Sequence, residues 1–292
     1  MSFFNLLARL AATLTVLALT AVCGWYLWDY YMNAPWTRDA RVRADIIQIA
    51  PDVSGLVTDV RTFDNQVVNK GDILFVIDRD RYQLAVNEAQ GTLESRQATL
   101  AQAQRDYIRV SKLNTISISI AQQEQYQSAA NVAEANVRQA QAALDIAKLN
   151  LVRTEVHAPA DGFITNFGLR RGDYVTAGMS VFALVDSSSF YINGYFEETK
   201  LPRIHVDDTA SIRLMGIKPE LGGHVSGIAS GIVDREQGAS PNLLANVNPT
   251  FNWVRLAQRI PVRIEIDHVP DGVKLVAGQT ATIVIHDDEK KK

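Results

Sequence analysis

Cysteine is almost absent from this chain of 292 residues, in which Cys23 is the single thiol. One cysteine excludes an intramolecular disulfide, a zinc site built on several thiolates and a CxxC redox pair. The five histidines are scattered, without the HxxxH or HxxE spacing of metalloenzymes. No constellation of catalytic, cofactor-binding or metal-ligating residues is visible in the sequence. We therefore expect a protein that is not an enzyme and carries neither a cofactor nor a metal.

An excess of charge of one sign is lacking as well. The formal net charge is -3 at pH 7, and the sequence pI is about 6.0. Acidic and basic residues are interspersed, with no basic block of the kind that follows a phosphate backbone. Nucleic acid is therefore not an expected partner.

Charged residues are also missing from a segment near the amino end, residues 10–28. As an α-helix this segment would reach about 28 Å, close to the ~30 Å hydrocarbon core of a bilayer. Aromatic rings gather at its far end, as they do at a membrane interface. We expect residues 1–32 to form a short cytoplasmic stub and a transmembrane anchor, with the bulk of the chain exported. The expected anchoring residues are Leu10, Leu14, Leu17, Trp25 and Trp28.

Two other interpretations of this amino-terminal segment exist. A cleaved signal peptide has a shorter apolar core that ends at a small-x-small site, whereas here the apolar run continues through GWYLW. A lipoprotein would use LTAVCG and lipidate Cys23, but Val22 occupies a position where a small residue is expected. We favour the retained anchor, with Cys23 as an ordinary buried apolar residue.

A short unit occurs twice, as IAPDVSGLVTDVRTFDNQVVNKGDILFVID at residues 49–78 and as HAPADGFITNFGLRRGDYVTAGMSVFALVD at residues 157–186. Glycines at fixed spacing between short apolar runs indicate strands joined by tight turns, where glycine accepts positive φ without strain. The matched positions are Gly55 with Gly162, Gly71 with Gly178, and Phe75 with Phe182. One copy alone would leave its apolar face in water. Residues 45–79 and 157–186 are therefore predicted to close on each other as a split β-sandwich.

The intervening residues 80–156 contain no proline and are rich in alanine, glutamine, glutamate and arginine, which favour helices. Apolar residues recur there with alternating spacings of four and three, the heptad pattern of a coiled coil. The first run is Val86, Ala89, Leu93, Leu100, Ala103, Tyr107 and Val110, interrupted by Arg96. The second is Tyr126, Ala130, Ala133, Val137, Ala140, Leu144, Ala147 and Leu151. The pattern predicts a long α-helical hairpin, whose second arm begins at a capping box of Ser119 and Gln122.

The carboxyl-terminal third alternates between apolar and polar residues. Residues 187–286 contain several such runs, separated by polar turns, and indicate an antiparallel β-barrel domain with a short helix at one opening. Residues 33–44 are expected to form a linker and a first strand, and the charged residues 287–292 a disordered tail. The predicted fold class is mainly β with a long coiled-coil hairpin, an amino-terminal transmembrane helix, a split sandwich and a barrel.

This order of parts resembles the periplasmic adaptor subunits of tripartite efflux pumps, the membrane fusion proteins of the HlyD family. The repeated unit is similar to a biotinyl or lipoyl carrier domain that has been split by the hairpin. The subfamily that exports p-hydroxybenzoic acid is the most similar. The motifs that carry this likeness are PWTRDARVRADIIQIAPDVSGLV, APADGFITN, SFYINGYFEETKL and NWVRLAQRIPVRI.

The resemblance implies partners and a contact site. The family's partners are an inner-membrane exporter, an outer-membrane channel and further copies of the adaptor, in a ring of six on the inner membrane of a Gram-negative bacterium. Its channel contact lies at the hairpin tip, with an arginine, a leucine four residues on and a serine seven beyond. Arg109 and Leu113 keep the first spacing, whereas position 120 is isoleucine and the nearest hydroxyls are Ser117 and Ser119. The alternative for Arg109 is an exposed helix charge without a partner.

Three functions are compared with the features of the sequence. The first is an adaptor for the export of aromatic carboxylic acids such as p-hydroxybenzoate. The second is an adaptor of a major-facilitator multidrug pump or of a protein-secretion system. The third is a biotin or lipoate carrier protein, which needs a lysine in a Met-Lys-Met or Asp-Lys-Ala setting at the turn between the two halves. Lys70 and Lys148 occur in neither setting, and the hairpin replaces that turn.

Overall fold

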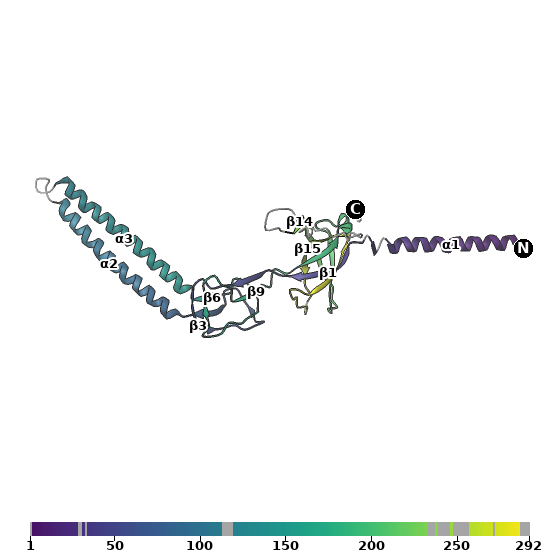
Figure 1. The fold of residues 1–292 in the computed structure, drawn as a ribbon, viewed down its shortest axis with the longest axis horizontal. Helices are drawn as coiled ribbons and strands as arrows, with labels where there is room; N and C mark the ends of the chain where they lie inside the picture. The colour runs from purple at the N-terminus through teal and green to yellow at the C-terminus, as the bar shows by residue number, and fades with distance from the viewer. Residues whose placement is uncertain are drawn as a thin grey trace. The chain divides into compact units, whose positions relative to one another are not determined.

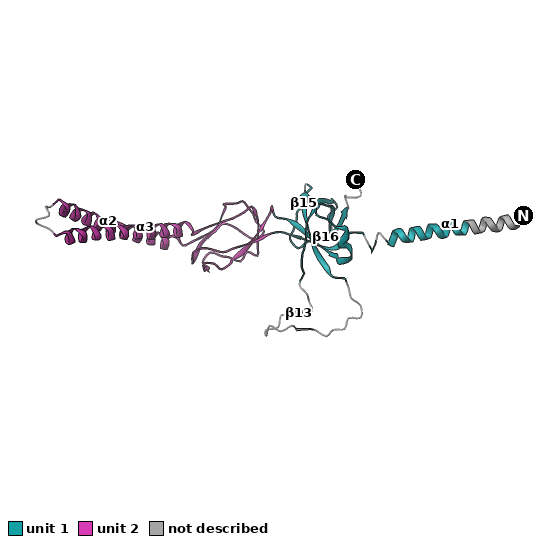
Figure 2. Cartoon of the chain, turned by 90° about the horizontal axis from the view of Figure 1, so that it is seen from above, with its two compact units in different colours: residues 1–44, 189–292 teal, residues 45–188 magenta. Residues whose placement is uncertain are grey.

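The computed structural model describes residues 2–28, 31–32, 34–112, 119–232, 237–238, 246–247, 257–270 and 272–286. The chain divides into two compact units, shown in teal and magenta in Figure 2. Residues 1–44 and 189–292 form the first unit, and residues 45–188 form the second. The predicted tail, residues 287–292, lies outside the described residues.

The first element is the helix α1, Ser2–Trp28. Its side chains from Ala12 onward are exposed, and so is Cys23, which we had expected to be buried. In the part of the chain that the structure describes, no helix is both long and apolar enough to cross a membrane. The transmembrane anchor stays a prediction.

A closed antiparallel barrel forms the folded part of the first unit, with the strand order β1-β10-β15-β12-β11-β16. Its strands are β1 (Trp36–Arg43), β10 (Tyr191–Glu197), β11 (Thr209–Leu214), β12 (Leu221–Ile228), β15 (Arg259–His268) and β16 (Thr280–His286). The short helix η2 (Glu198–Arg203) follows β10, and two short strands, β13 (Gln237–Gly238) and β14 (Asn246–Val247), pair with each other. The predicted first strand is β1, which closes the barrel because it pairs with both β10 and β16.

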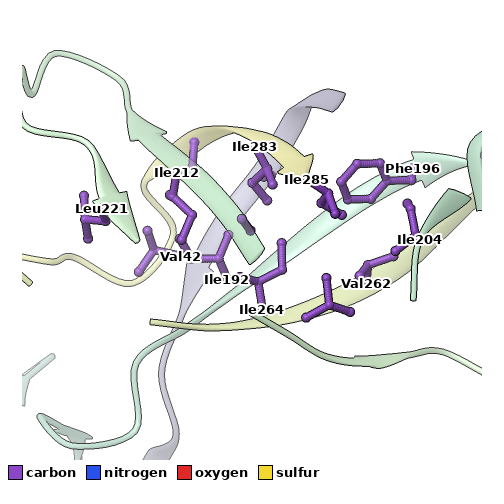
Figure 3. Close-up of a cluster of buried hydrophobic side chains, with 14 of the residues drawn as sticks. Val42, Ile192, Phe196, Ile204, Ile212, Leu221, Val262, Ile264, Ile283 and Ile285 are labelled. Atoms are coloured by element: carbon purple, nitrogen blue, oxygen red, sulfur yellow. The ribbon is translucent and has the colours of Figure 1, made fainter. Parts of the chain in front are cut away.

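The barrel core follows from simple alternation. Along β10 and β16 every second side chain is buried, as expected of strands with one face directed inward. The inward side chains form one apolar cluster, in which Ile192, Phe196 and Ile264 are fully buried (Figure 3). This cluster is the core that holds the barrel closed.

Two four-stranded sheets form the sandwich of the second unit, with strand orders β2-β9-β7-β4 and β6-β5-β3-β8. The first copy, together with the residues just before it, provides β2 (Ile46–Ile49), β3 (Gly55–Val60), β4 (Val67–Val68) and β5 (Ile73–Ile77). The second copy, together with the residues just before it, provides β6 (Glu155–His157), β7 (Gly162–Thr165), β8 (Tyr174–Val175) and β9 (Phe182–Asp186). Each sheet takes two strands from each copy, so neither copy forms a sheet by itself.

The two sheets are equivalent under exchange of the copies. Replacing β2, β9, β7 and β4 by their counterparts β6, β5, β3 and β8 converts one strand order into the other. The hydrogen bonds repeat as well. Gly71 N donates to Ala158 O at 2.8 Å, and Gly178 N donates to Pro51 O at 2.9 Å. The sandwich therefore has an internal pseudo-twofold relation, which explains why the unit occurs twice in the sequence.

The four matched glycines serve two different purposes. Gly71 and Gly178 have φ of 92° and 78°, which confirms them as turn residues. Gly55 and Gly162 are the first residues of β3 and β7, so our assignment of these two to turns was wrong. A Cβ on Gly162 would lie 2.1 Å from Val185 O, so this position needs glycine for close approach of two strands.

Two long helices, α2 (Arg79–Ser111) and α3 (Ile120–Val152), separate the two copies and lie side by side (Figure 1). Each has 33 residues, which corresponds to about 50 Å at the α-helical rise. Ser119 caps α3, with its side chain accepting from Gln122 N at 3.3 Å, as the capping pattern predicted. The coiled-coil supercoil itself stays a prediction.

Candidate functional site: the helix pair and its base

The base of the helix pair is part of the sandwich. Helix α2 follows β5 directly, and α3 ends just before β6, the antiparallel neighbour of β5. Ile77 N donates to Thr154 O at 2.8 Å, so the two chain segments are already hydrogen-bonded where the helices begin and end. Asp78 caps α2 by accepting from Asp80 N at 3.1 Å. The direction of both helices is therefore set by two paired strands.

Further contacts connect the first and last turns of the pair to the sandwich. Tyr82 OH donates to Ser54 O at 2.8 Å, and the aromatic ring packs against the sandwich core. The Thr154 side chain is fully buried, with Oγ1 donating to Leu151 O at 2.7 Å. Arg79 forms an ion pair with Glu155 across the base. Half-exposed pairs of this kind add little stability, so the orientation of the helices depends mainly on the strand pairing and on Tyr82.

The heptad positions form the contact between the helices. Leu93, Ala133, Ala140 and Leu144 are buried, and the other predicted apolar positions are half-buried. Alanine at several of these positions lets the two backbones approach closely. Arg96, which interrupts the first run, is exposed. The predicted packing face is confirmed, and Arg96 marks a gap in it.

At the far end of the pair the structure describes two of the four predicted contact residues. Arg109 lies in the last turn of α2, where its side chain is 73% exposed and forms an ion pair with Asp106 at 3.3 Å. Ser119 is the cap of α3 and is an exposed residue. Leu113 and Ser117 lie outside the described residues. The arginine therefore has a partner on its own helix, contrary to the unpaired alternative.

The predicted anchoring residues all belong to α1. Leu14, Leu17, Trp25 and Trp28 are each more than half exposed. Leu10 lies in the same helix, upstream of the side chains that the structure describes.

Within the described ranges, no cluster of three or more histidine, cysteine, aspartate or glutamate side chains could hold a metal ion. The helix pair is about 50 Å long and is fixed at one end by a folded domain. This arrangement can hold the far end of the helices at a defined distance and direction from the sandwich.

Sequence reasoning missed Tyr82 and Thr154 as residues of the base. Neither residue stands out in the sequence, because threonine and tyrosine near a helix end form no distinctive motif. Only their position could have identified them, because both residues lie next to the boundary between helix and strand, at the inner ends of the two copies.

Two family models match the chain in succession. The first, described as RND MFP, barrel-sandwich hybrid domain, matches residues 45–187. The second, described as AAEA-like beta-barrel domain, matches residues 189–286. The boundary between them coincides with the boundary between the two compact units near residue 188.

Relatives extend this likeness along the chain. The protein YdhJ of Escherichia coli (strain K12), which is described as uncharacterized, is 42% identical over 274 residues, or 94% of this chain and 96% of that protein. The membrane fusion protein Spr0693 from Streptococcus pneumoniae R6 has a similar fold, with a TM-score of 0.64, 13% identity and coverage of 86% of this chain and 98% of that one. A MacA-MexA chimera containing the Pseudomonas aeruginosa MexA α-hairpin domain gives a TM-score of 0.63 at 20% identity, covering 87% and 82%.

The chain combines a sandwich that is interrupted by a long helix pair with a closed barrel. The two family models match these two parts, and the relative of nearly equal length extends the likeness over 94% of the chain. The chain belongs to the membrane fusion proteins.

Proposed function

We propose that this chain is the adaptor of a tripartite efflux pump, which joins an inner-membrane exporter to an outer-membrane channel across the periplasm. The observation that carries the proposal is the mounting of α2 and α3 on the paired strands β5 and β6. A folded sandwich gains no stability from projecting two helices of 33 residues away from itself. Their length is explained if the far end contacts another protein.

The amino-terminal segment supports attachment to the inner membrane. Residues 10–28 contain no charge, and aromatic rings follow at the end of the run. In this proposal the amino terminus is cytoplasmic, the segment spans the membrane once and is retained, and the remaining chain is periplasmic. The mature protein then sediments with inner membranes, and its intact mass includes residue 1.

The far end of the helix pair is the proposed contact with the channel. Arg109 is exposed and has donors to spare beyond its ion pair with Asp106, so it can donate to carbonyl or carboxylate oxygens of a partner. Leu113 supplies an apolar side chain four residues on. Self-association in a ring, of six copies by family resemblance, would bring several such ends to one channel and seal the conduit.

The proposed cargo is the class of aromatic carboxylic acids, such as p-hydroxybenzoate. Its support is the short helical hairpin and the motif RDARVRAD at residues 38–45, which resemble the aromatic-acid subfamily. A major-facilitator multidrug exporter or a protein-secretion system is the competing assignment.

Purification of the tagged full-length protein from crosslinked membranes tests this function, with mass spectrometry of the captured proteins. We expect an inner-membrane exporter and an outer-membrane channel in near-stoichiometric amounts, and the class of the exporter identifies the cargo. Capture of carboxylases or dehydrogenase complexes, with no membrane protein, would instead support the carrier alternative.

A further inference from the structure

A small cavity that is open to solvent lies beside the end of the ladder between strands β1 and β10. The ladder between β1 and β10 runs from Ala40 to Arg43, and β1 has an irregularity between Thr37 and Ala40 in its pairing with β16. Thr37 Oγ1 donates to Tyr195 O at 2.8 Å and bridges the two strands there. The cavity measures about 330 Å³ and is lined by Trp36, Thr37, Arg38, Asp39, Tyr195, Glu197, Lys200 and Arg259.

Strand alternation explains why polar and aromatic side chains face this cavity. Phe196 of β10 is fully buried in the barrel core, so its neighbours Tyr195 and Glu197 lie on the opposite face. The size of the cavity is at the lower end of the range for small-molecule sites. It is sufficient for a single aromatic ring with one substituent.

A buried lysine residue lines the cavity. Lys200 of η2 is 8% exposed, and its Nζ donates to Trp36 O at 3.3 Å. Among the residues that the structure describes, no carboxylate forms an ion pair with it. An ammonium has three donors, and a buried charge is costly unless it is paired. Within the described ranges, this lysine therefore has no anionic partner.

Trp36 supplies an aromatic wall beside this lysine. Lys200 Nζ lies 4.9 Å from the centroid of the Trp36 ring, and Arg38 Cζ lies 5.4 Å from the same centroid. The indole Nε1 of Trp36 is buried and has no acceptor within the described part of the chain. The two cations therefore lie close to one aromatic ring. A flat anion that pairs with these cations could also contact the edge or face of the ring.

The charges around the cavity indicate the charge of the ligand. Arg259 is paired with Asp39. The remaining charged residues that line the cavity are the cations Arg38 and Lys200 and the anion Glu197. One positive charge is in excess. A ligand with a single negative charge would balance this excess positive charge, whereas a dianion would leave a net negative charge.

From these observations we infer that the cavity binds a small aromatic carboxylate, with its carboxylate on Lys200 and Arg38 and its ring against Trp36. The ligand would reach the adaptor itself, in addition to the exporter. The interpretation of this ligand as cargo rests on the proposed function. The binding of the ligand to the cavity does not depend on that function.

Isothermal titration calorimetry on the full-length protein in detergent, with benzoate as the ligand, tests this inference. Acetate supplies the charge without the ring, benzamide the ring without the charge, and inorganic phosphate a denser anion. Lys200→Met keeps the buried methylene stem and removes the ammonium. Lys218→Met removes an exposed lysine elsewhere in the first unit and serves as the matched control.

We expect saturable one-site binding of benzoate, with acetate and benzamide each at least about tenfold weaker. Lys200→Met should weaken benzoate about tenfold or more, with its thermal unfolding curve unchanged, and Lys218→Met should not. The inference is overturned if benzoate binds equally well to Lys200→Met, if phosphate binds as tightly as benzoate, or if no benzoate binding is measured up to 10 mM, a concentration about tenfold above a ~1 mM Kd. None of these outcomes affects capture of the exporter and channel, so failure of the cavity and failure of the adaptor function remain distinguishable.

Discussion

The rings of Phe75 and Phe182 meet edge to face in the sandwich core, with centroids 6.0 Å apart and planes at 70°. These residues occupy the same position in the two copies of the repeated unit. One comes from β5 and the other from β9, which lie in different sheets. Equivalent residues touch each other when they lie close to a twofold relation, so this pair connects the two copies at the centre of the domain.

Truncating either ring should destabilise the sandwich to a similar extent. Phe75 and Phe182 are 0% and 4% exposed, and phenylalanine-to-alanine changes in a core cost about 3–5 kcal/mol. The double variant should show a coupling energy of about 0.5–1.5 kcal/mol. Each single variant already loses the edge-to-face contact, so the double variant costs less than the sum of the two single variants. Peptide-resolved hydrogen exchange of β5 and β9 measures these local stabilities.

Phe63→Ala is the control for this experiment, because Phe63 is 65% exposed in the same unit. Its change should stay within about 0.5 kcal/mol. Strongly unequal costs at the two core positions would contradict the equivalence of the copies.

Gly162→Ala should destabilise the sandwich by about 3 kcal/mol, the upper end for inserting a carbon into a packed core. The new Cβ would lie 2.1 Å from Val185 O, and a backbone oxygen in a paired strand cannot move aside as a side chain can. Gly168→Ala is the matched control, because no atom lies within 4 Å of its Cβ position and its φ is not positive. Equal thermal midpoints for the two variants would show that β7 and β9 separate without cost.

The repeat and the heptads made the main parts of the second unit predictable. The repeated glycines and apolar runs located both halves, and the spacing of Leu93, Ala140 and Leu144 identified the face between the helices. The exchange of strands between the sheets could not be read from either copy, because β3 and β5 have the same local pattern whichever sheet they join. The spacing also could not show that Gly162 serves close packing rather than a turn, since both uses place a glycine between apolar runs.

Removal of the helix pair should leave the sandwich folded. If residues 82–152 are excised and the ends are joined by a short glycine-containing turn, β5 and β6 remain antiparallel neighbours. Residues 45–188 without the helices should give dispersed amide NMR signals and a β-type circular dichroism spectrum. An unfolded spectrum would mean that contacts such as Tyr82 OH to Ser54 O are needed for folding.

The candidate contact residues were less predictable than the fold. Arg109 was located by resemblance, and its ion pair with Asp106 became visible only in the structure. Lys200 and Trp36 are distant in sequence and are brought together by barrel closure, which no local pattern encodes.

Substitutions at the far end of the helix pair should abolish export without affecting stability. Arg109→Glu reverses an exposed charge, and Leu113→Asp removes an apolar contact, so each should stop efflux of aromatic acids from cells. Exposed helix positions such as Arg109 usually change stability by no more than about 0.5 kcal/mol, so expression and thermal unfolding should match the unchanged protein.

Arg96→Ala provides the control, because Arg96 is exposed midway along the same helix. Its export should equal that of the unchanged protein. Normal export by both tip variants, in cells that lack any other adaptor, would mean that docking does not use these residues.

Site-specific photo-crosslinking in living cells tests the central claim most directly. A photoreactive amino acid replaces Arg109, or Arg96 as the control, and the crosslinked products are identified by mass spectrometry. The account predicts an adduct between position 109 and an outer-membrane channel protein, and no channel adduct from position 96. Crosslinks from position 109 only to inner-membrane proteins, or to other adaptor copies alone, would contradict it.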